Sequence, residues 1–286
     1  MRRNRINRCK PLLGTYVDVS IEADLDDEQL LDLSIDAFEA ITRVHDTLGF
    51  HNPDSELSDV NRWAQSGSAE PIAISEDLRR VMELALNLSA ASDGLFDVTV
   101  APRLVQQGSL PHVHRDAILS GAGNWQDVTL SDEGLSFRAP VLIDLGGIAK
   151  GYAVDQAIAR IAANKMHVDI NVNVNAGGDL YLSNWQEECV GVRYPDELNR
   201  HYDMPMLAPA LATSACYFSE QDSVMIHPGS GEALVRGYSV SVFAEHCMLA
   251  DALTKLAFLN PGDSSVVRQF NGRAFLLDSQ NGLLEL

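Results

Sequence analysis

The sequence is poor in positive charge. Its 286 residues contain 21 Lys and Arg against 40 Asp and Glu, a formal net charge of −19. Binding to nucleic acid needs a basic face that displaces counterions from phosphates, so this balance argues against a nucleic-acid partner and against an anionic membrane. Acidity mainly favours solubility. An acidic protein still binds phosphates where a lysine, a metal ion or backbone N–H groups supply local positive charge.

Long apolar runs and closely spaced cysteines are also missing. No apolar run approaches the about 18 residues that a membrane-spanning helix requires. The segment 1–10 is rich in basic residues, but no apolar stretch of the kind found in a secretory signal follows it. We therefore expect no transmembrane segment, a cytoplasmic location and a flexible N-terminus over residues 1–10. A zinc site or a disulfide framework is disfavoured, because the cysteines are far apart and form no C-x-x-C: Cys9, Cys189, Cys216 and Cys247.

Hydrophobic residues make up 46% of the chain, enough for a substantial core. Alternating patterns predict half-buried strands over residues 15–22 and 168–175, and a hairpin over residues 128–137. Helical spacing predicts one helix after Asp24 or Asp26 and others near residues 75 and 245. The first helix is expected to bury one apolar stripe: Leu31, Ile35, Phe38, Ile41, Val44 and Leu48.

Further strands are predicted at 190–194, 209–213, 222–226, 238–243 and 273–278. Strands thus outnumber helices and are mostly joined by short turns, which favours an α+β fold with largely antiparallel sheets flanked by helices. The length allows one or two domains, and we expect a single domain over residues 11–286. The irregular segment 103–126 indicates a lid or binding loop. Its two histidines, His112 and His114, are better explained as surface residues than as metal ligands.

Residues 144–155, Asp-Leu-Gly-Gly-Ile-Ala-Lys-Gly-Tyr-Ala-Val-Asp, form the most informative segment. The apolar run 141–143 before it predicts a buried strand, and helical spacing predicts a helix from Ile148 or Ala149. Gly146 and Gly147 allow a ligand to approach the main chain closely. Together these features predict either a phosphate site or a plain strand-to-helix turn. The glycine spacing fits neither the dinucleotide fingerprint nor the P-loop.

Three further polar clusters lie near the ends of predicted elements. Ser55, on its own, is best explained as a helix cap. Asp97 follows Phe96 at a predicted strand start, where it would bind a ligand or stabilise a turn. Gly177 and Gly178, after the predicted strand 168–175, again permit close backbone approach.

A last cluster lies inside the final predicted helix. Helical geometry places Asp251 beside Thr254 and Lys255. A carboxylate in an otherwise apolar helical stretch costs free energy unless it is paired or binds a cation. The pattern therefore predicts either an Asp251–Lys255 ion pair or a Mg²⁺ site built on the Asp251 carboxylate.

Taken in order along the chain, these clusters resemble the ApbE family of flavin transferases. Residues 144–155 match the family pattern D-L-G-G-I-A-K-G-[YF]-A-[VL]-D at every position, and residues 175–179 match N-x-G-G-[DN]. Residues 13–15, 55–61, 94–99, 212–214 and 250–253 resemble further motifs of the family. The resemblance extends from about residue 11 to residue 285.

The resemblance implies an ApbE-like, T-fold-related architecture and a Mg²⁺-dependent FAD:protein FMN transferase. Such an enzyme cleaves FAD at its pyrophosphate, joins FMN through its phosphate to a threonine hydroxyl of an acceptor protein, and releases AMP. For Mg²⁺ it implies the Ala149 carbonyl and the Asp251 carboxylate, with Thr254 as a substitute ligand if the helix shifts. For FAD it implies a larger set of contacts: Leu13, Ser55, Asn61, Phe96, Asp97, Asp144, Gly146, Gly147, Lys150, Gly177, Gly178, Thr213 and Ser214.

Two positions depart from the family pattern within the chemistry. Val224 stands where the family has a histidine, and His227, three residues on, is the remaining candidate base. In a strand, however, positions 224 and 227 face opposite sides. Lys255 stands where the family has a metal-ligating threonine, and an ammonium there would supply positive charge in place of a metal.

Three hypotheses follow from these departures. The first is an active FMN transferase in which His227 and Asp251 act as catalytic residues. The second is an FAD-binding protein with impaired transfer, serving as a flavin carrier or regulator. The third is an interaction protein that kept the scaffold and lost the flavin.

Overall fold

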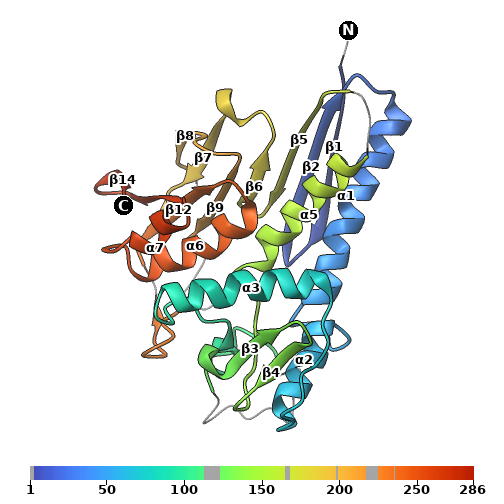
Figure 1. Ribbon diagram of the computed structural model, residues 1–286. Coiled ribbons are helices and arrows are strands. Elements are labelled where there is room, and N and C mark those ends of the chain that lie inside the picture. Colours follow the sequence, from blue (N-terminus) through green and yellow to red (C-terminus); the bar gives the residue numbers. More distant parts are fainter. Residues whose placement is uncertain (1–2, 113–122, 165–167, 198, 217–224, 235) are drawn as a thin grey trace.

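The computed structural model describes residues 3–112, 123–164, 168–197, 199–216, 225–234 and 236–286. Within these residues the central element is an eight-stranded sheet in which all neighbouring strands are antiparallel (Figure 1). In spatial order its strands are β1 (Asn4–Leu12), β2 (Thr15–Ala23), β5 (Ile170–Ala176), β6 (Asp179–Leu182), β9 (Ala210–Ser214), β12 (Tyr238–Ala244), β13 (Arg273–Asp278) and β14 (Gly282–Glu285).

Three helices, α1 (Asp27–Leu48), α5 (Ala149–Ala163) and α6 (Cys247–Leu259), pack side by side against this sheet (Figure 1). Strand side chains alternate between two faces. Val240 and Val242 of β12 join the core under the helices, while Phe243 joins a second cluster with residues of the hairpin β7 (Cys189–Arg193) and β8 (His201–Pro205). The sheet is therefore covered on one face by helices and on the other by a hairpin.

Several of the remaining elements form a smaller part of the structure beside the ends of α1 and α5 (Figure 1). It holds α2 (Glu56–Gln65), α3 (Glu76–Ala91), α4 (Ala101–Gln106) and the hairpin β3 (Val128–Ser131) and β4 (Gly134–Phe137). Outside it lie β10 (Met225–Ile226), β11 (Ala233–Leu234) and α7 (Ser265–Gln269), and short 3₁₀ turns occur at Val98–Val100, Trp125–Asp127 and Trp185–Glu187. Among the described residues, no helix has the length and apolar character needed to cross a membrane.

Helix α1 shows where the sequence pattern held and where it failed. Asp26 caps the helix as predicted, since its carboxylate accepts a hydrogen bond from the Gln29 N–H at 2.8 Å. Leu31 and Ile35 were expected inside, yet they are 41% and 37% exposed. The buried stripe instead includes Leu30 and Ser34, each one position before these two, and follows the 3.6-residue period. Its members are Leu30, Leu33, Ser34, Ala37, Phe38, Ala40, Ile41, Val44 and Leu48.

The N-terminal segment differs from the expected flexible end. From Asn4 to Leu12 it pairs residue by residue with β2 and forms the edge strand of the sheet. Arg8 donates a hydrogen bond to Ser34 at 2.9 Å, and the Lys10 ammonium lies 4.5 Å from the centre of the Phe38 ring. Basic side chains on an edge strand discourage pairing with further chains, so the positive charge of this segment is compatible with ordered structure.

Residues 141–143 were predicted to be a buried strand. They are buried, but they belong to none of the sheets that the described residues form. The Asn61 amide group accepts a hydrogen bond from the Ile143 N–H at 2.7 Å and donates one to the Ile143 carbonyl at 2.9 Å. Gln65 donates another to the Val141 carbonyl at 2.6 Å. Side chains of α2 thus replace the neighbouring strand that buried backbone groups require.

Replacing Asn61 with alanine should therefore destabilise the protein strongly. Two buried backbone groups of Ile143 would lose their partners, at about 1–3 kcal/mol each. Chemical denaturation of Asn61→Ala against wild type measures the change in the free energy of unfolding. Asn87→Ala, at an exposed position of α3, is the matched control and should change it by less than about 0.5 kcal/mol. Equal stability of the two variants would contradict this account of segment 141–143.

Candidate functional site

A cavity of about 540 Å³ opens where the start of α5 meets the end of β9 and the helix α6. Its volume lies within the about 300–1,000 Å³ that is usual for cofactor sites. Apolar side chains line it from several elements: Leu95, Phe96, Leu104, Leu110, Met225, Ile226, Phe258 and Leu259. The predicted FAD-contact residues that line it are Phe96, Asp97, Asp144, Gly146, Gly147, Lys150, Gly177, Thr213 and Ser214.

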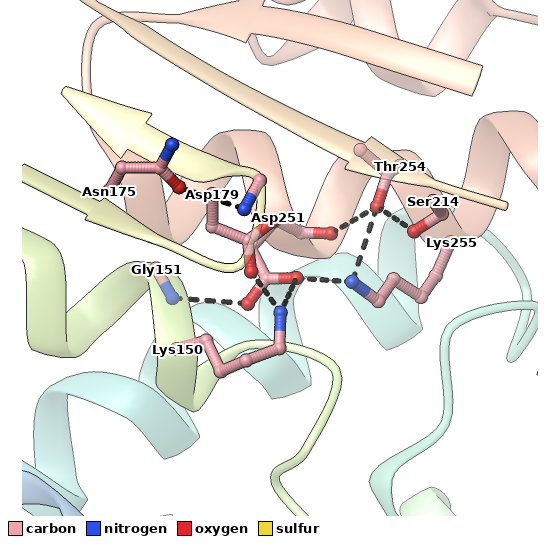
Figure 2. A network of polar contacts seen from close by, with 9 residues as sticks. Lys150, Gly151, Asn175, Asp179, Ser214, Asp251, Thr254 and Lys255 are labelled. Atoms are coloured by element: carbon pink, nitrogen blue, oxygen red, sulfur yellow. Dashed lines mark hydrogen bonds and ion pairs between the residues drawn. The ribbon is translucent and has the colours of Figure 1, made fainter. Parts of the chain in front are cut away.

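Two lysines of the cavity wall are paired with two buried aspartates (Figure 2). Lys150 pairs with Asp179, and Lys255 pairs with Asp251. The Lys150 Nζ also lies 3.9 Å from the Asp251 Oδ1. Asp179 and Asp251 are 2% and 0% exposed, whereas the side chains of Lys150 and Lys255 keep 31% and 17% exposure. We call these four residues the charge cluster.

The opposite charges of the charge cluster offset the effect of burial on the pKa values of Asp251 and Lys150. Burial alone would raise the pKa of the Asp251 carboxyl, but the ammonium groups of Lys150 and Lys255 hold this pKa below its usual value. Burial would likewise lower the pKa of Lys150, yet Asp179 and Asp251 raise it above its usual value. Burial and the nearby Asp251 carboxylate raise the pKa of Asp179, against the opposing effect of Lys150 and Lys255. Two carboxyl groups and two ammonium groups thus lie together beside the cavity.

Hydroxyl groups extend this network towards β9 (Figure 2). The Thr254 hydroxyl donates to the Asp251 backbone carbonyl at 2.7 Å and lies 2.7 Å from the Ser214 Oγ. Because a hydroxyl has only one proton, Ser214 is the donor to Thr254. The Lys255 ammonium donates to the same Thr254 oxygen at 3.2 Å. Thr254 is thus fully buried behind Lys255, with its oxygen already engaged.

These contacts bear on the two predictions for Asp251. The structure confirms the Asp251–Lys255 ion pair. The second carboxylate oxygen of Asp251 accepts a hydrogen bond from the Gly151 N–H at 3.1 Å. Among the described residues, no group of three or more His, Cys, Asp or Glu side chains could hold a metal ion. Mg²⁺ needs several oxygen ligands in octahedral geometry, so the donors around Asp251 and Thr254, with Ala149 as the first residue of α5, do not fit it.

Two further residues of segment 144–155 join α5 to α6. The Asp155 carboxylate accepts hydrogen bonds from the Cys247 and Met248 N–H groups at 2.8 and 2.9 Å and so caps α6. A Cβ atom at Gly151 would lie 2.3 Å from the Cys247 carbonyl oxygen, too close for any side chain. Gly151 is therefore required for the close contact between the helices.

The glycine turn after β5 lies next to the turn between β1 and β2. Leu13, in that second turn, has a φ of 56°, and it lines a separate hollow of about 410 Å³. A Cβ atom at Gly177 would lie 2.5 Å from the Thr15 hydroxyl oxygen, so these two turns touch. The Gly178 N–H donates to the Asn175 side chain at 2.8 Å. Gly177 therefore faces the cavity, while Leu13 and Gly178 support the turns around it.

Three other predicted site residues make hydrogen bonds that stabilise the local backbone. Ser55 caps α2, accepting a hydrogen bond from the Ser58 N–H at 3.1 Å, and Asn61 holds segment 141–143. The His227 Nδ1 accepts from the N–H groups of Gly229 and Ser230 at 3.2 and 3.3 Å. A neutral imidazole with Nδ1 as acceptor carries its proton on Nε2, so this geometry favours turn stabilisation over proton acceptance.

Two residues considered in the sequence analysis lie outside the described residues. Val224, which replaces the family histidine, is one, and His114 in the segment 103–126 is the other. His112 is exposed, as expected.

Sequence reasoning left Asp179 out of the site residues and gave Lys255 as a partner of Asp251 and as a departure from the family pattern. A signal for Asp179 existed, since an acid directly follows the Gly177-Gly178 pair. The buried Asp179 carboxylate in turn requires a positively charged partner, which Lys150 supplies. The apolar cavity wall from residues 95–110 and 225–226 carried no comparable signal, because its residues are brought together only by the fold.

Comparison with known proteins gives the family. The ApbE family model matches residues 13–273. The chain belongs to the ApbE family. The proteins named FAD:protein FMN transferase from Vibrio cholerae and Haemophilus influenzae are 28% and 26% identical to it. The first match covers 87% of this chain and 79% of that protein, the second 86% and 79%.

Solved structures of this family show the same fold. The flavin transferase ApbE from Vibrio cholerae superimposes with a TM-score of 0.81 at 23% identity, over 100% of this chain and 97% of that one. The ApbE protein from Thermotoga maritima gives 0.80 at 22% identity, over 99% and 97%. The predicted α+β architecture of antiparallel sheet and flanking helices is confirmed.

Asp155 should make stability depend on pH. Burial raises its pKa from 3.8 to about 6, against the opposing effect of its two hydrogen bonds. A raised carboxyl pKa means that this group's contribution to the free energy of unfolding is complete below about pH 4 and is lost as the pH rises through 6. The difference is about 1–3 kcal/mol.

Asp155→Asn keeps an acceptor for the helix cap and removes the titration. Denaturation at several pH values should show wild type losing stability relative to Asp155→Asn between pH 4 and 7. Asp132→Asn, in an exposed turn, is the control, and parallel curves for Asp155→Asn and wild type would refute the prediction.

Gly151→Ala should push α5 and α6 apart. An added Cβ atom cannot fit against the Cys247 carbonyl, and overpacking of this kind costs about 1–3 kcal/mol. The melting temperature should fall accordingly. Gly262→Ala is the matched control, because a Cβ atom there would contact only the Asn260 side chain, at 3.7 Å. A Gly151→Ala variant as stable as Gly262→Ala would show that the helices do not depend on this contact.

Proposed function

We propose that this protein is an FAD:protein FMN transferase. It takes the FMN part of FAD, joins it through its phosphate to a threonine hydroxyl of an acceptor flavoprotein, and releases AMP. The observation that carries the proposal is the cavity itself. Segment 144–155, which matches the family pattern at every position, supplies Asp144, Gly146, Gly147 and Lys150 to its wall. The matches to relatives named FAD:protein FMN transferase extend over most of the chain.

The cavity supplies what a dinucleotide flavin would need. The Lys150 ammonium and the N-terminal end of α5 provide positive potential for a pyrophosphate. The apolar side chains of Phe96, Leu104 and Phe258 suit a flat aromatic ring system. An acidic protein therefore presents a local site for an anion.

The transfer step breaks the bond between the FMN phosphorus and the bridging oxygen that leaves with AMP. It forms a new bond from that phosphorus to the threonine oxygen, and the hydroxyl proton must be accepted. His227 and Asp251 were the expected catalytic residues, but His227 is turned to the backbone and Asp251 is ion-paired. Asp97 and Asp144 line the cavity, and burial raises the pKa of both carboxyls. The Asp97 Oδ1 already accepts from the Thr99 N–H and hydroxyl at 2.8 and 2.7 Å. Asp144 is therefore the better candidate to accept the proton.

A second function has an observation in its favour. If Asp251 and His227 are both withdrawn from chemistry, the cavity would still bind FAD while transfer would be slow. The protein would then act as a flavin carrier or regulator. A protein without flavin is disfavoured, because the cavity and its paired lysines remain. For the Mg²⁺ that the family resemblance implies, the described residues offer no group of three or more His, Cys, Asp or Glu side chains. Both Asp251 oxygens are already engaged, so no step is assigned to the metal.

Lys150→Met should weaken FAD binding by about 10- to 100-fold, the loss of one charge-assisted contact of about 1.5–3 kcal/mol. Lys150→Arg, which keeps the charge, should recover part of it, and Lys10→Met on β1 is the control. Quenching of flavin fluorescence on titration with protein gives the affinity, and a melting curve checks the fold of each variant.

Transfer is measured separately, by incubating the protein with FAD and a threonine-bearing acceptor and reading fluorescence of the acceptor in a gel. A labelled acceptor with release of AMP supports the transferase. Bound FAD without labelling supports the carrier. Failure of the wild-type protein to bind FAD would overturn both.

A further inference from the structure

The charge cluster lies beside the glycine turn at the wall of the cavity. Lys255 comes from α6 and reaches across the glycine turn, since a Cβ atom at Gly147 would lie 3.5 Å from the Lys255 Cε. Both Gly147 and Lys255 line the cavity. The ammonium of Lys255 therefore lies beside the same turn whose backbone would approach a phosphate.

The anionic groups that could hold a metal here are already satisfied. Of the two Asp251 oxygens, one is paired with Lys255 and the other accepts from Gly151. Asp179 is paired with Lys150. A divalent cation at Asp251 would have to displace the Lys255 ammonium or lie within a few ångströms of it, and like charges at such distances in a partly buried site repel strongly.

The two lysines have N–H donors left to offer a ligand. Their partners are almost completely buried, while the lysine side chains keep 31% and 17% exposure and both line the cavity. An ammonium group has three donors. Lys150 uses one on Asp179, and Lys255 uses two, on Asp251 and Thr254. Each can therefore also donate to an anion in the cavity.

We propose that the pyrophosphate-type ligand of this cavity is held by charge-assisted hydrogen bonds from the ammonium groups of Lys150 and Lys255 and binds without a divalent cation. Lys255 takes the place of the cation, and Asp251 fixes its position from behind. The inference rests on the proposed function for the identity of the ligand as FAD. The chemistry it invokes, an ammonium pair on a pyrophosphate, applies equally to ADP, which has a pyrophosphate and no flavin.

The test is binding of FAD and of ADP to the wild-type protein by calorimetry, in EDTA and in excess Mg²⁺. The expected result is that both affinities differ by less than about twofold between the two conditions, and that both fall with added salt. The protein alone should show no heat of Mn²⁺ binding.

The variant Lys255→Thr should bind FAD at least about tenfold more weakly in EDTA, since one charge-assisted contact is lost. Lys10→Thr, the same substitution on β1, should bind as wild type. Lys255→Arg, which keeps a positive charge beside Asp251, serves as a second variant if Lys255→Thr does not fold, and should remain independent of Mg²⁺.

The outcomes separate this inference from the proposed function. Wild-type protein that binds FAD in Mg²⁺ and loses it in EDTA overturns the inference and leaves the transferase in place. Binding of ADP in EDTA without binding of FAD supports the ammonium site and overturns the flavin function. Binding of neither ligand under either condition overturns both.

Discussion

The contact between α5 and α6 is the constraint on which the site depends. Each helix supplies a carboxylate to the backbone of the other: Asp155 of α5 caps the start of α6, and Asp251 of α6 accepts from the Gly151 N–H of α5. Gly151 makes this possible, because the backbones meet too closely for a side chain. The crossing fixes where Lys150 and Lys255 stand relative to one another, and with them the charged wall of the cavity.

Burial explains why each aspartate of the charge cluster has a lysine partner. Removing charges from water is costly, and the cost is recovered only if each charge has close partners and hydrogen bonds. Asp179 and Asp251 meet this condition through two lysines that line the cavity. A chain with a net charge of −19 thus gains a local site for an anion from residues that first serve to stabilise one another.

The fold was predictable where periodicity is strong. The hairpin 128–137, the strand 273–278 and the inward face of α3 follow directly from alternating or helical patterns. Predictions were wrong where the pattern did not reveal which groups a segment pairs with. Segment 141–143 is apolar enough for a strand, but its partners are the side chains of Asn61 and Gln65. Residues 1–10 are basic without periodic apolar positions, and only pairing with β2 orders them from Asn4 onward.

The candidate site divides in the same way. The sequence by itself determined the family, through segment 144–155, and it predicted the Asp251–Lys255 pair, because neighbours at i and i+4 on a helix are fixed by local geometry. Only the tertiary structure brought Asp179 to Lys150, assigned Asp155 to the cap of α6 and turned the His227 Nδ1 to its own backbone. These contacts join residues whose distance depends on how helices and strands pack, and packing is a property of the whole chain that no local pattern contains.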